Sequence, residues 1–177
     1  SIYVLSLGGS MIVPDEINLS YLFQLKKLLE KSPHKFLVVC GGGGIARKYI
    51  SALRKAGKSS FEQSLVGIAV TRLNAHFLNS LFDKKFSDIP LDMKHAASLL
   101  RKQKIVFCGA LRYADDSTSD ETAAKLSKYL NSILINMTNV PGLYTANPQT
   151  HPKAKLITNI SWKNFEAKAF KLKYKPG

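Results

Sequence analysis

The segment "VVCGGGGIARKYI", Val38 to Ile50, joins a short apolar run to a segment with helical spacing through four consecutive glycines. Ordering four glycines costs conformational entropy, so this position needs a backbone without side chains. Backbone N–H groups at a glycine turn and at a helix start point outward, and with the helix dipole they attract anions. Because one glycine would serve a tight turn, four in a row favour an anion site. A strand-to-helix turn without a ligand is the alternative.

Strand-like and helix-like segments alternate on both sides of these glycines. Short apolar runs predict four strands, and the first two have the unbroken apolar pattern of strands buried on both faces: residues 2–7, 35–40, 104–109 and 132–137. Apolar residues three and four apart predict helices over residues 17–32, 45–57, 61–86, 93–103 and 119–130. In the last of these, Ser119 is the expected N-cap, followed by Asp120 in the first turn. This order predicts an α/β fold with βαβ crossovers and a mostly parallel sheet.

Ligands of such folds bind at the carboxyl ends of the strands. Four unusual loops follow the predicted strands, and we expect them to share one crevice: "GGS" (8–10), "GGGG" (41–44), "GALRYADDSTSD" (109–120) and "TNVPGLYTANP" (138–148). Arg47, one turn into the helix after the second loop, is placed to add a charge-assisted contact to a bound anion.

The composition is that of an ordinary globular protein with an unusual charge. The 177 residues are 45% hydrophobic and carry 26 Lys and Arg against 12 Asp and Glu, a net charge of +14. This balance favours anionic partners such as nucleotides, phosphates or nucleic acid. The basic residues are spread along predicted helices without a basic tail or an aromatic-rich RNA-binding motif, so a solvated surface is favoured over a nucleic-acid partner.

Other features bear on location and metals. No apolar run approaches the roughly 20 residues of a membrane span, and the N-terminus lacks the basic region of a signal peptide. We therefore expect a cytoplasmic protein without a membrane partner. Cys40 and Cys108 are interpreted as small buried residues in a reducing compartment. Two cysteines and four scattered histidines have no metal-ligand spacing, so no dedicated metal site is expected.

Standard nucleotide-binding motifs are absent from the sequence. It has no P-loop motif, no dinucleotide-binding fingerprint and no protein-kinase signature set. Phosphoryl transfer nevertheless needs mainly donors around the transferred group and a means of holding two substrates in line. Two facing glycine loops would meet this need.

Five collinear stretches cover most of the chain and resemble the amino acid kinase family, and within it the archaeal-type uridylate (UMP) kinases: "LGGSMIVP", "VVCGGGGIARKYI", "VGIAVTRLNAHFL", "STSDETAAKLSKYLNSILINMTNVPGLYTANP" and "HPKAKLI". The resemblance implies an open αβα sandwich with a mostly parallel central sheet, spanning residues 1–177 as one domain. It implies a cytoplasmic homohexamer that converts UMP to UDP with ATP and Mg²⁺ in pyrimidine nucleotide biosynthesis. The family continues into a segment with a functional lysine, so residues 1–177 are expected to lack that C-terminal part.

The resemblance also implies roles for single residues, taken position by position. Asp120 matches the catalytic acid that organises the glycine loops and Mg²⁺, although from the residues alone it is equally a simple helix-start acid. The matches on the ATP side are Gly9, Ser10, Gly43, Arg47, Thr138, Tyr144 and Asn147. The matches on the UMP side are Gly42, Ser64, Thr118 and Ser119.

Three positions depart from the family pattern. Ser6 stands where many members have lysine, Ser64 where an aspartate holds the UMP ribose, and Asn147 where an aspartate precedes proline. The alternatives are therefore another small-phosphate kinase, such as one acting on isopentenyl phosphate, a carboxylate kinase, or a silent member that binds nucleotide or RNA. Arg72 and Asn74 in "VTRLNA" either line a subunit interface or structure the helix, and the structural role is favoured.

Overall fold

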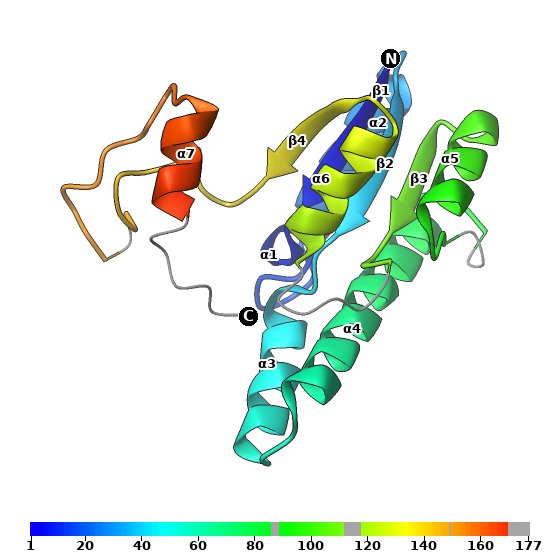
Figure 1. The fold of residues 1–177 in the computed structure, drawn as a ribbon. Coiled ribbons are helices and arrows are strands. Elements are labelled where there is room, and N and C mark those ends of the chain that lie inside the picture. The colour runs from blue at the N-terminus through cyan, green and yellow to red at the C-terminus, as the bar shows by residue number, and fades with distance from the viewer. Residues whose placement is uncertain (86–88, 112–117, 149, 170–177) are drawn as a thin grey trace. The chain divides into compact units, whose positions relative to one another are not determined.

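The computed structural model describes residues 1–85, 89–111, 118–148 and 150–169 (Figure 1). The chain divides into two compact units, Ser1–Met137 and Thr138–Pro176. Each unit is described by itself, and the prediction of one domain over residues 1–177 stays a prediction.

The first unit is built on a four-stranded sheet whose strand pairs are all parallel. Its strands are β1 (Ile2–Leu7), β2 (Lys35–Cys40), β3 (Ile105–Cys108) and β4 (Ile133–Met137), in the order β3-β2-β1-β4. The predicted α/β fold and the four predicted strands are confirmed. Because all four strands run the same way, the loops after β1, β2 and β3 leave from one edge of the sheet.

Of the helices in the described ranges, six belong to the first unit: α1 (Gly9–Ile12), α2 (Leu19–Lys31), α3 (Gly43–Lys55), α4 (Ser60–Leu81), α5 (Met93–Lys102) and α6 (Ser119–Tyr129). One, α7 (Trp162–Ala169), belongs to the second unit. The sequence did not predict the short helices α1 and α7. Several predicted bounds differ from those of the structure. Helix α3 begins within the glycines, two residues earlier than predicted, and α4 ends at Leu81, where Phe82 caps it and Asp83 takes a left-handed φ of 55°.

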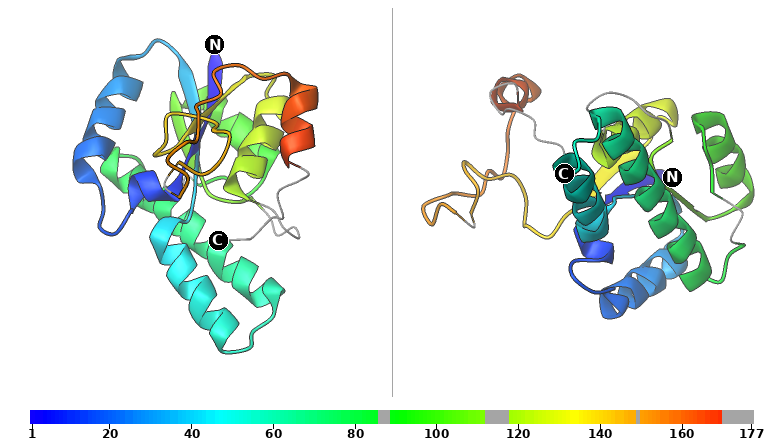
Figure 2. Two further views of the ribbon diagram at one scale, coloured as in Figure 1. Left: turned by 90° about the vertical axis from the view of Figure 1, so that its left-hand side faces the viewer. Right: turned by 90° about the horizontal axis from the view of Figure 1, so that it is seen from below.

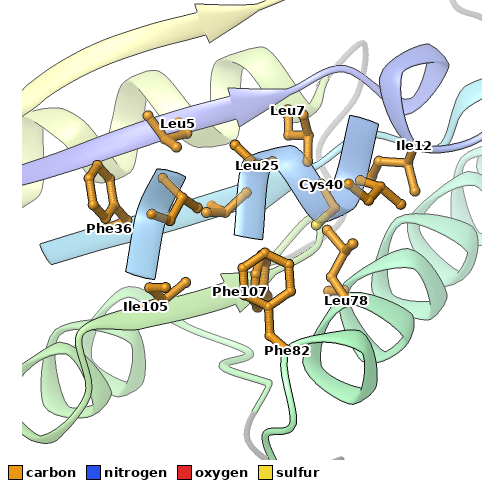
Figure 3. Close-up of a cluster of buried hydrophobic side chains, with 14 of the residues drawn as sticks. Leu5, Leu7, Ile12, Leu25, Phe36, Cys40, Leu78, Phe82, Ile105 and Phe107 are labelled. Atoms are coloured by element: carbon orange, nitrogen blue, oxygen red, sulfur yellow. The ribbon is translucent and has the colours of Figure 1, made fainter. Parts of the chain in front are cut away.

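Helices cover both faces of this sheet (Figure 2). On one face, side chains of α2 and α4 pack against β1, β2 and β3; Figure 3 shows Leu25, Leu78 and Phe82 there, with the Phe82 ring edge-on to Phe107 at 4.7 Å between centroids. On the other face, α5 and α6 pack against Val4, Leu37 and Val106 and contribute residues such as Leu100 and Leu126. Successive strand residues point to opposite faces, so burial on both faces explains the unbroken apolar runs.

The edge strand β4 differs from the three others. Its apolar residues Ile133, Leu134 and Ile135 remain 57%, 40% and 42% exposed.

The apolar face of α2 is narrower than its apolar spacing suggests, because Leu22, Leu25 and Leu29 are buried whereas Leu28 is 65% exposed. Apolar spacing finds the helix, but the width of its contact with the sheet decides which residues are covered.

Polar side chains define where the helices begin. Ser59 and Glu62 form a capping box at the start of α4, in which each side chain bonds the other residue's backbone N–H. At α6 the predicted N-cap is wrong by one residue. Thr118 is the cap, since its hydroxyl oxygen accepts from the backbone N–H of Glu121 at 3.1 Å, and Ser119 is already helical.

Candidate active site at the carboxyl edge of the sheet

The two glycine loops are packed backbone against backbone. A side chain on Gly9 would overlap the backbone nitrogen of Gly43, and one on Gly43 would come within 2.5 Å of the carbonyl oxygen of Gly9. Gly43 also has a φ of 65°, which L-amino acids with side chains rarely adopt. The close approach that the sequence indicated is therefore present, and the partner in the structure is the other loop. Gly41 and Gly43 are buried, and Gly42 and Gly44 are half-buried.

Backbone donors are available where these loops meet. Helix α3 begins at Gly43, so the N–H groups of its first turn have no acceptor within the helix. Within the described ranges, the N–H groups of Gly42, Gly43 and Gly44 have no backbone acceptor outside α3. The positive end of the helix dipole lies at the same place. These donors have the chemistry of an anion site.

Arg47 lies beside this loop on the outer side of α3. It is exposed and lines an open cavity of about 520 Å³ together with Pro14, Asp15, Gly44, Lys48, Ser51, Ala52 and Lys55. Three basic side chains and one acidic one line this cavity, so its potential is positive. A phosphate group at the glycine loop would have the Arg47 guanidinium within one helical turn.

Asp120 is tied directly to strand β1. The hydroxyl of Ser6 donates a hydrogen bond of 2.5 Å to Oδ1 of Asp120, which is exposed in the first turn of α6. Ser6 is only 1% exposed and lies two residues before Gly8, the N-cap of α1. The bond therefore fixes the carboxylate at the strand that leads into the first glycine loop. Sequence reasoning noted Ser6 only as a departure from the family and did not link it to Asp120.

Helix α4 contacts two of the site loops through three polar side chains. Asn74 donates from Nδ2 to the carbonyl oxygen of Gly41 at 2.7 Å. Thr71 accepts from the backbone N–H of Ala110 at 2.9 Å, and Arg72 donates to the carbonyl oxygens of Ala110 and Leu111 at 3.1 and 2.8 Å. We call Thr71, Arg72 and Asn74 the α4 clamp. Arg72 and Asn74 therefore bond the backbone of the loops rather than that of their own helix, and their spacing in "TRLN" was the only signal in the sequence.

Three other residues expected to contact UMP are less closely grouped. Ser64 lies on α4 one turn before Gly67, whose carbonyl oxygen is 3.8 Å from the place a side chain on Gly42 would begin. The hydroxyl oxygen of Thr118 is used in capping α6, and Ser119 is half-buried beside it. Residues 112–117 of the same loop lie outside the described part of the chain. The UMP-side roles stay predictions.

Three expected ATP contacts belong to the second unit. Thr138 begins it, Tyr144 forms an antiparallel bridge with Leu156, and the carbonyl oxygen of Asn147 accepts from the N–H groups of Thr150 and His151. The backbone of Asn147 thus stabilises its own loop by accepting these two hydrogen bonds. Ser10, the remaining expected contact in the first unit, is half-buried in α1 next to Gly9.

The cysteines behave as predicted from their positions at the ends of strands. Cys40 and Cys108 are free thiols and fully buried. Cys40 belongs to the core on the α2–α4 face and Cys108 to the core on the α5–α6 face. Burial raises the pKa of both thiols, that of Cys108 to about 12.

The described residues contain neither a cluster of metal ligands nor a membrane-spanning helix. No group of three or more His, Cys, Asp or Glu side chains there has the arrangement of a metal site. Among the described helices none combines the length and the apolar character needed to cross a membrane.

Comparison with known proteins agrees with this architecture. Residues 1–174 match the amino acid kinase family. The chain is 34% identical over 164 residues to the uridylate kinase of Thermococcus sibiricus, covering 89% of this chain and 71% of that protein. The crystal structure of uridylate kinase from Archaeoglobus fulgidus matches with a TM-score of 0.69 and 33% identity, over 86% of this chain and 71% of that one.

A more distant structure shares the fold alone. An isopentenyl phosphate kinase matches with a TM-score of 0.66 and 21% identity, over 89% of this chain and 81% of that one. At this identity the match shows that the two proteins have the same fold. With a match that spans nearly its whole length, the chain belongs to the amino acid kinase family.

Proposed function

We propose that the protein is a uridylate kinase, which transfers the γ-phosphoryl group of ATP to UMP. The observation that carries the proposal is the packing of the loop at Gly9 against the loop at Gly43, with Asp120 fixed to the strand before them. Relatives at about one-third identity carry the name uridylate kinase, which supports UMP as the acceptor.

The reaction needs no covalent intermediate on the protein. A phosphate oxygen of UMP attacks the γ-phosphorus of ATP, the bond from that phosphorus to the bridging oxygen breaks, and ADP leaves. The donors at the glycine loops stabilise the charge on the transferred group, and they are held in place before the reaction begins. Gly42 is assigned to the UMP phosphate, with Ser64, Thr118 and Ser119 on the same side.

In the first unit, the ATP side comprises the backbone of Gly9, Ser10 and Gly43 with the Arg47 guanidinium. In the second unit, Thr138, Tyr144 and Asn147 keep the adenine-nucleotide roles that the resemblance implies. Asp120 does not attack. Its carboxylate would hold donors near the transferred group or help to bind Mg²⁺ there. Mg²⁺ binds proteins through one or two carboxylates and completes its coordination shell with substrate phosphates and water. A site with one acidic side chain beside N–H groups that donate to phosphate fits this ion. When bound, the ion would neutralise phosphate charge.

The proposal includes the pathway, the cellular compartment and the assembly of the protein. As in the family that the sequence resembles, we assign the protein to pyrimidine nucleotide biosynthesis in the cytoplasm and to a homohexameric assembly. Size measurement of the purified protein by light scattering tests the assembly separately from activity.

A second candidate function is favoured by one residue. Ser64 stands where the family has the aspartate for the UMP ribose, and a site without that contact would suit an acceptor without ribose. An isopentenyl phosphate kinase shares the fold. The rival acceptors are therefore small phosphates and carboxylates.

The test is a panel of phosphate acceptors with ATP and Mg²⁺, followed by release of ADP. We expect UMP to give the highest kcat/KM. Faster turnover of CMP, AMP or isopentenyl phosphate would overturn the choice of acceptor. A protein that turns over none of them but binds RNA with a steep dependence on salt would be a binding protein instead.

A further inference from the structure

The α4 clamp joins the two loops that border the proposed acceptor side. Asn74 holds the glycine loop at Gly41, the first residue after β2. Three and two residues earlier, Thr71 and Arg72 hold Ala110 and Leu111, just after β3. Side chains three apart lie on neighbouring parts of one helix surface, so a single turn of α4 reaches both loops. The two loops are therefore fixed to one rigid element as well as to their own strands.

The packing around the clamp is tight. Thr71 and Asn74 are 8% and 4% exposed, and the next turn of α4 is anchored in the core by the fully buried Ala75 and Leu78. A side chain on Gly109 would come within 2.6 Å of the backbone nitrogen of Arg72 and of the Thr71 hydroxyl. Backbone of the β3 loop thus lies directly on the clamp.

The clamp uses its polar groups almost entirely on backbone. Thr71 accepts from Ala110 and donates its own hydroxyl hydrogen to the carbonyl oxygen of Ile68 at 2.7 Å. Among the described residues, Arg72 has no carboxylate partner. Its planar guanidinium carries several N–H donors, and two of them bond carbonyl oxygens of the loop after β3. Apolar side chains at the buried positions 71 and 74 would make none of these bonds, so the polar groups hold the two loops.

We propose that Thr71, Arg72 and Asn74 are positioning residues that set the gap between the glycine loop and the loop after β3, and thereby the rate of transfer to the acceptor phosphate. The proposal rests on the proposed function for its kinetic part. In-line transfer depends on the two phosphates being held at a fixed separation, and misplacement by about 1 Å can cost roughly 10²-fold in rate. Loosening either loop should therefore lower kcat more than it raises KM.

The main test compares two buried asparagines of the same helix. Asn74→Leu removes the bond to Gly41, and Asn79→Leu is the matched control, since Asn79 is 1% exposed and donates to the backbone of Lys85, away from the glycine loops. We expect both variants to lose stability to a similar extent. Only Asn74→Leu should lose kcat on UMP, by about 10-fold or more. Equal losses of kcat in the two variants would overturn the proposal.

A second pair covers the outcome in which Asn74→Leu fails to fold. Thr71→Val is nearly isosteric and removes the acceptor for Ala110, whereas Thr71→Ser keeps it. We expect Thr71→Val to lower kcat and to speed hydrogen exchange of the Ala110 amide, and Thr71→Ser to restore both. Normal kcat in a folded Thr71→Val would contradict the kinetic role.

The exchange measurement separates this inference from the proposed function. A wild-type protein that does not phosphorylate UMP would refute the proposed acceptor, and the variants are then compared on whichever phosphate of the panel is turned over. An Ala110 amide that exchanges at the same rate in wild type and Thr71→Val overturns the clamp, whatever the acceptor.

Discussion

The hydroxyl of Ser6 donates a hydrogen bond of 2.5 Å to the carboxylate of Asp120, joining residues 114 positions apart in the chain. Ser6 is buried in β1 and its partner is exposed at the first turn of α6. One oxygen of the carboxylate is thereby directed toward β1, and the other is left for water, a donor or a metal. The contact gives Asp120 a fixed orientation, which a helix-start acid would not need.

Replacing Asp120 by Asn tests the charge alone, because Asn keeps an oxygen that accepts from Ser6. We expect near-normal substrate binding and a fall in kcat of about 10²-fold or more, the scale of losing one preorganised electrostatic group. If Asp120 serves only the helix dipole, turnover stays near normal and the free energy of unfolding falls by roughly 0.5–1 kcal/mol. Measuring kcat and urea unfolding on the same variant decides between these roles.

Replacing Ser6 by Ala tests whether the orientation of Asp120 matters. The variant loses a hydrogen bond to a charged group, a type of contact worth about 1.5–3 kcal/mol. We expect kcat to fall several-fold, because the carboxylate is no longer held. The same change made in an Asp120→Ala background should have little further effect on kcat, since a double-mutant cycle isolates the pair. Equal effects of Ser6→Ala in both backgrounds would show that Ser6 acts independently of Asp120.

Replacing Arg47 by Ala should weaken ATP binding and leave the fold intact. Arg47 is exposed, and no ion pair involves it within the described ranges. Loss of one charge-assisted bond to phosphate should raise KM for ATP by roughly 10-fold. Lys94→Ala is the control, because it removes one positive charge from the exposed face of α5. A similar rise of KM in both variants would mean that only the net charge matters.

Gly42→Val should abolish binding of both nucleotides. The structure adds a second consequence. The new side chain would overlap the Cβ of Ala46 in the first turn of α3, so the helix start must shift. We expect lower thermal stability as well as lost affinity, measured by calorimetry. Gly67→Ala is the control, since its added carbon is 3.3 Å from the flexible end of Ile50 and alanine favours the helix. Normal nucleotide affinity in Gly42→Val would refute the anion site.

The buried thiols predict a dependence of stability on alkaline pH. Burial raises the pKa of Cys108 from an ordinary 9.0 to about 12, and that of Cys40 well above 9.0. The unfolded chain therefore releases these protons first, and the stability of the fold decreases as pH rises above 9. The slope approaches about 1.4 kcal/mol per pH unit for each thiol.

Urea unfolding between pH 8 and pH 11 measures this slope, and Cys108→Ala should make it shallower. In the native state at pH 8 neither thiol should react with iodoacetamide, whereas both should react in urea. Labelling of the native protein would show that the strands open more readily than their burial implies.

Local sequence patterns were enough for most of the secondary structure. The unbroken apolar runs identified β1 and β2 because both faces of those strands are covered, and burial is what the pattern records. Helix bounds were less accurate where a tertiary contact decides them. Helix α3 starts inside the glycines because the backbone of Gly9 packs on Gly43, and Thr118 rather than Ser119 caps α6 because its oxygen is the one that reaches Glu121.

The sequence by itself determined that this protein has a parallel α/β sheet with glycine loops at the carboxyl ends of its first two strands. These features depend on residue type and on spacing within one element, which a single sequence displays. Only the tertiary structure decided that Ser6 orients Asp120, that Asn74 holds Gly41, and that the glycines face each other. The reason is physical: a hydrogen bond between residues 33 or 114 positions apart depends on how helices pack on the sheet to within an ångström, and no local pattern encodes that placement.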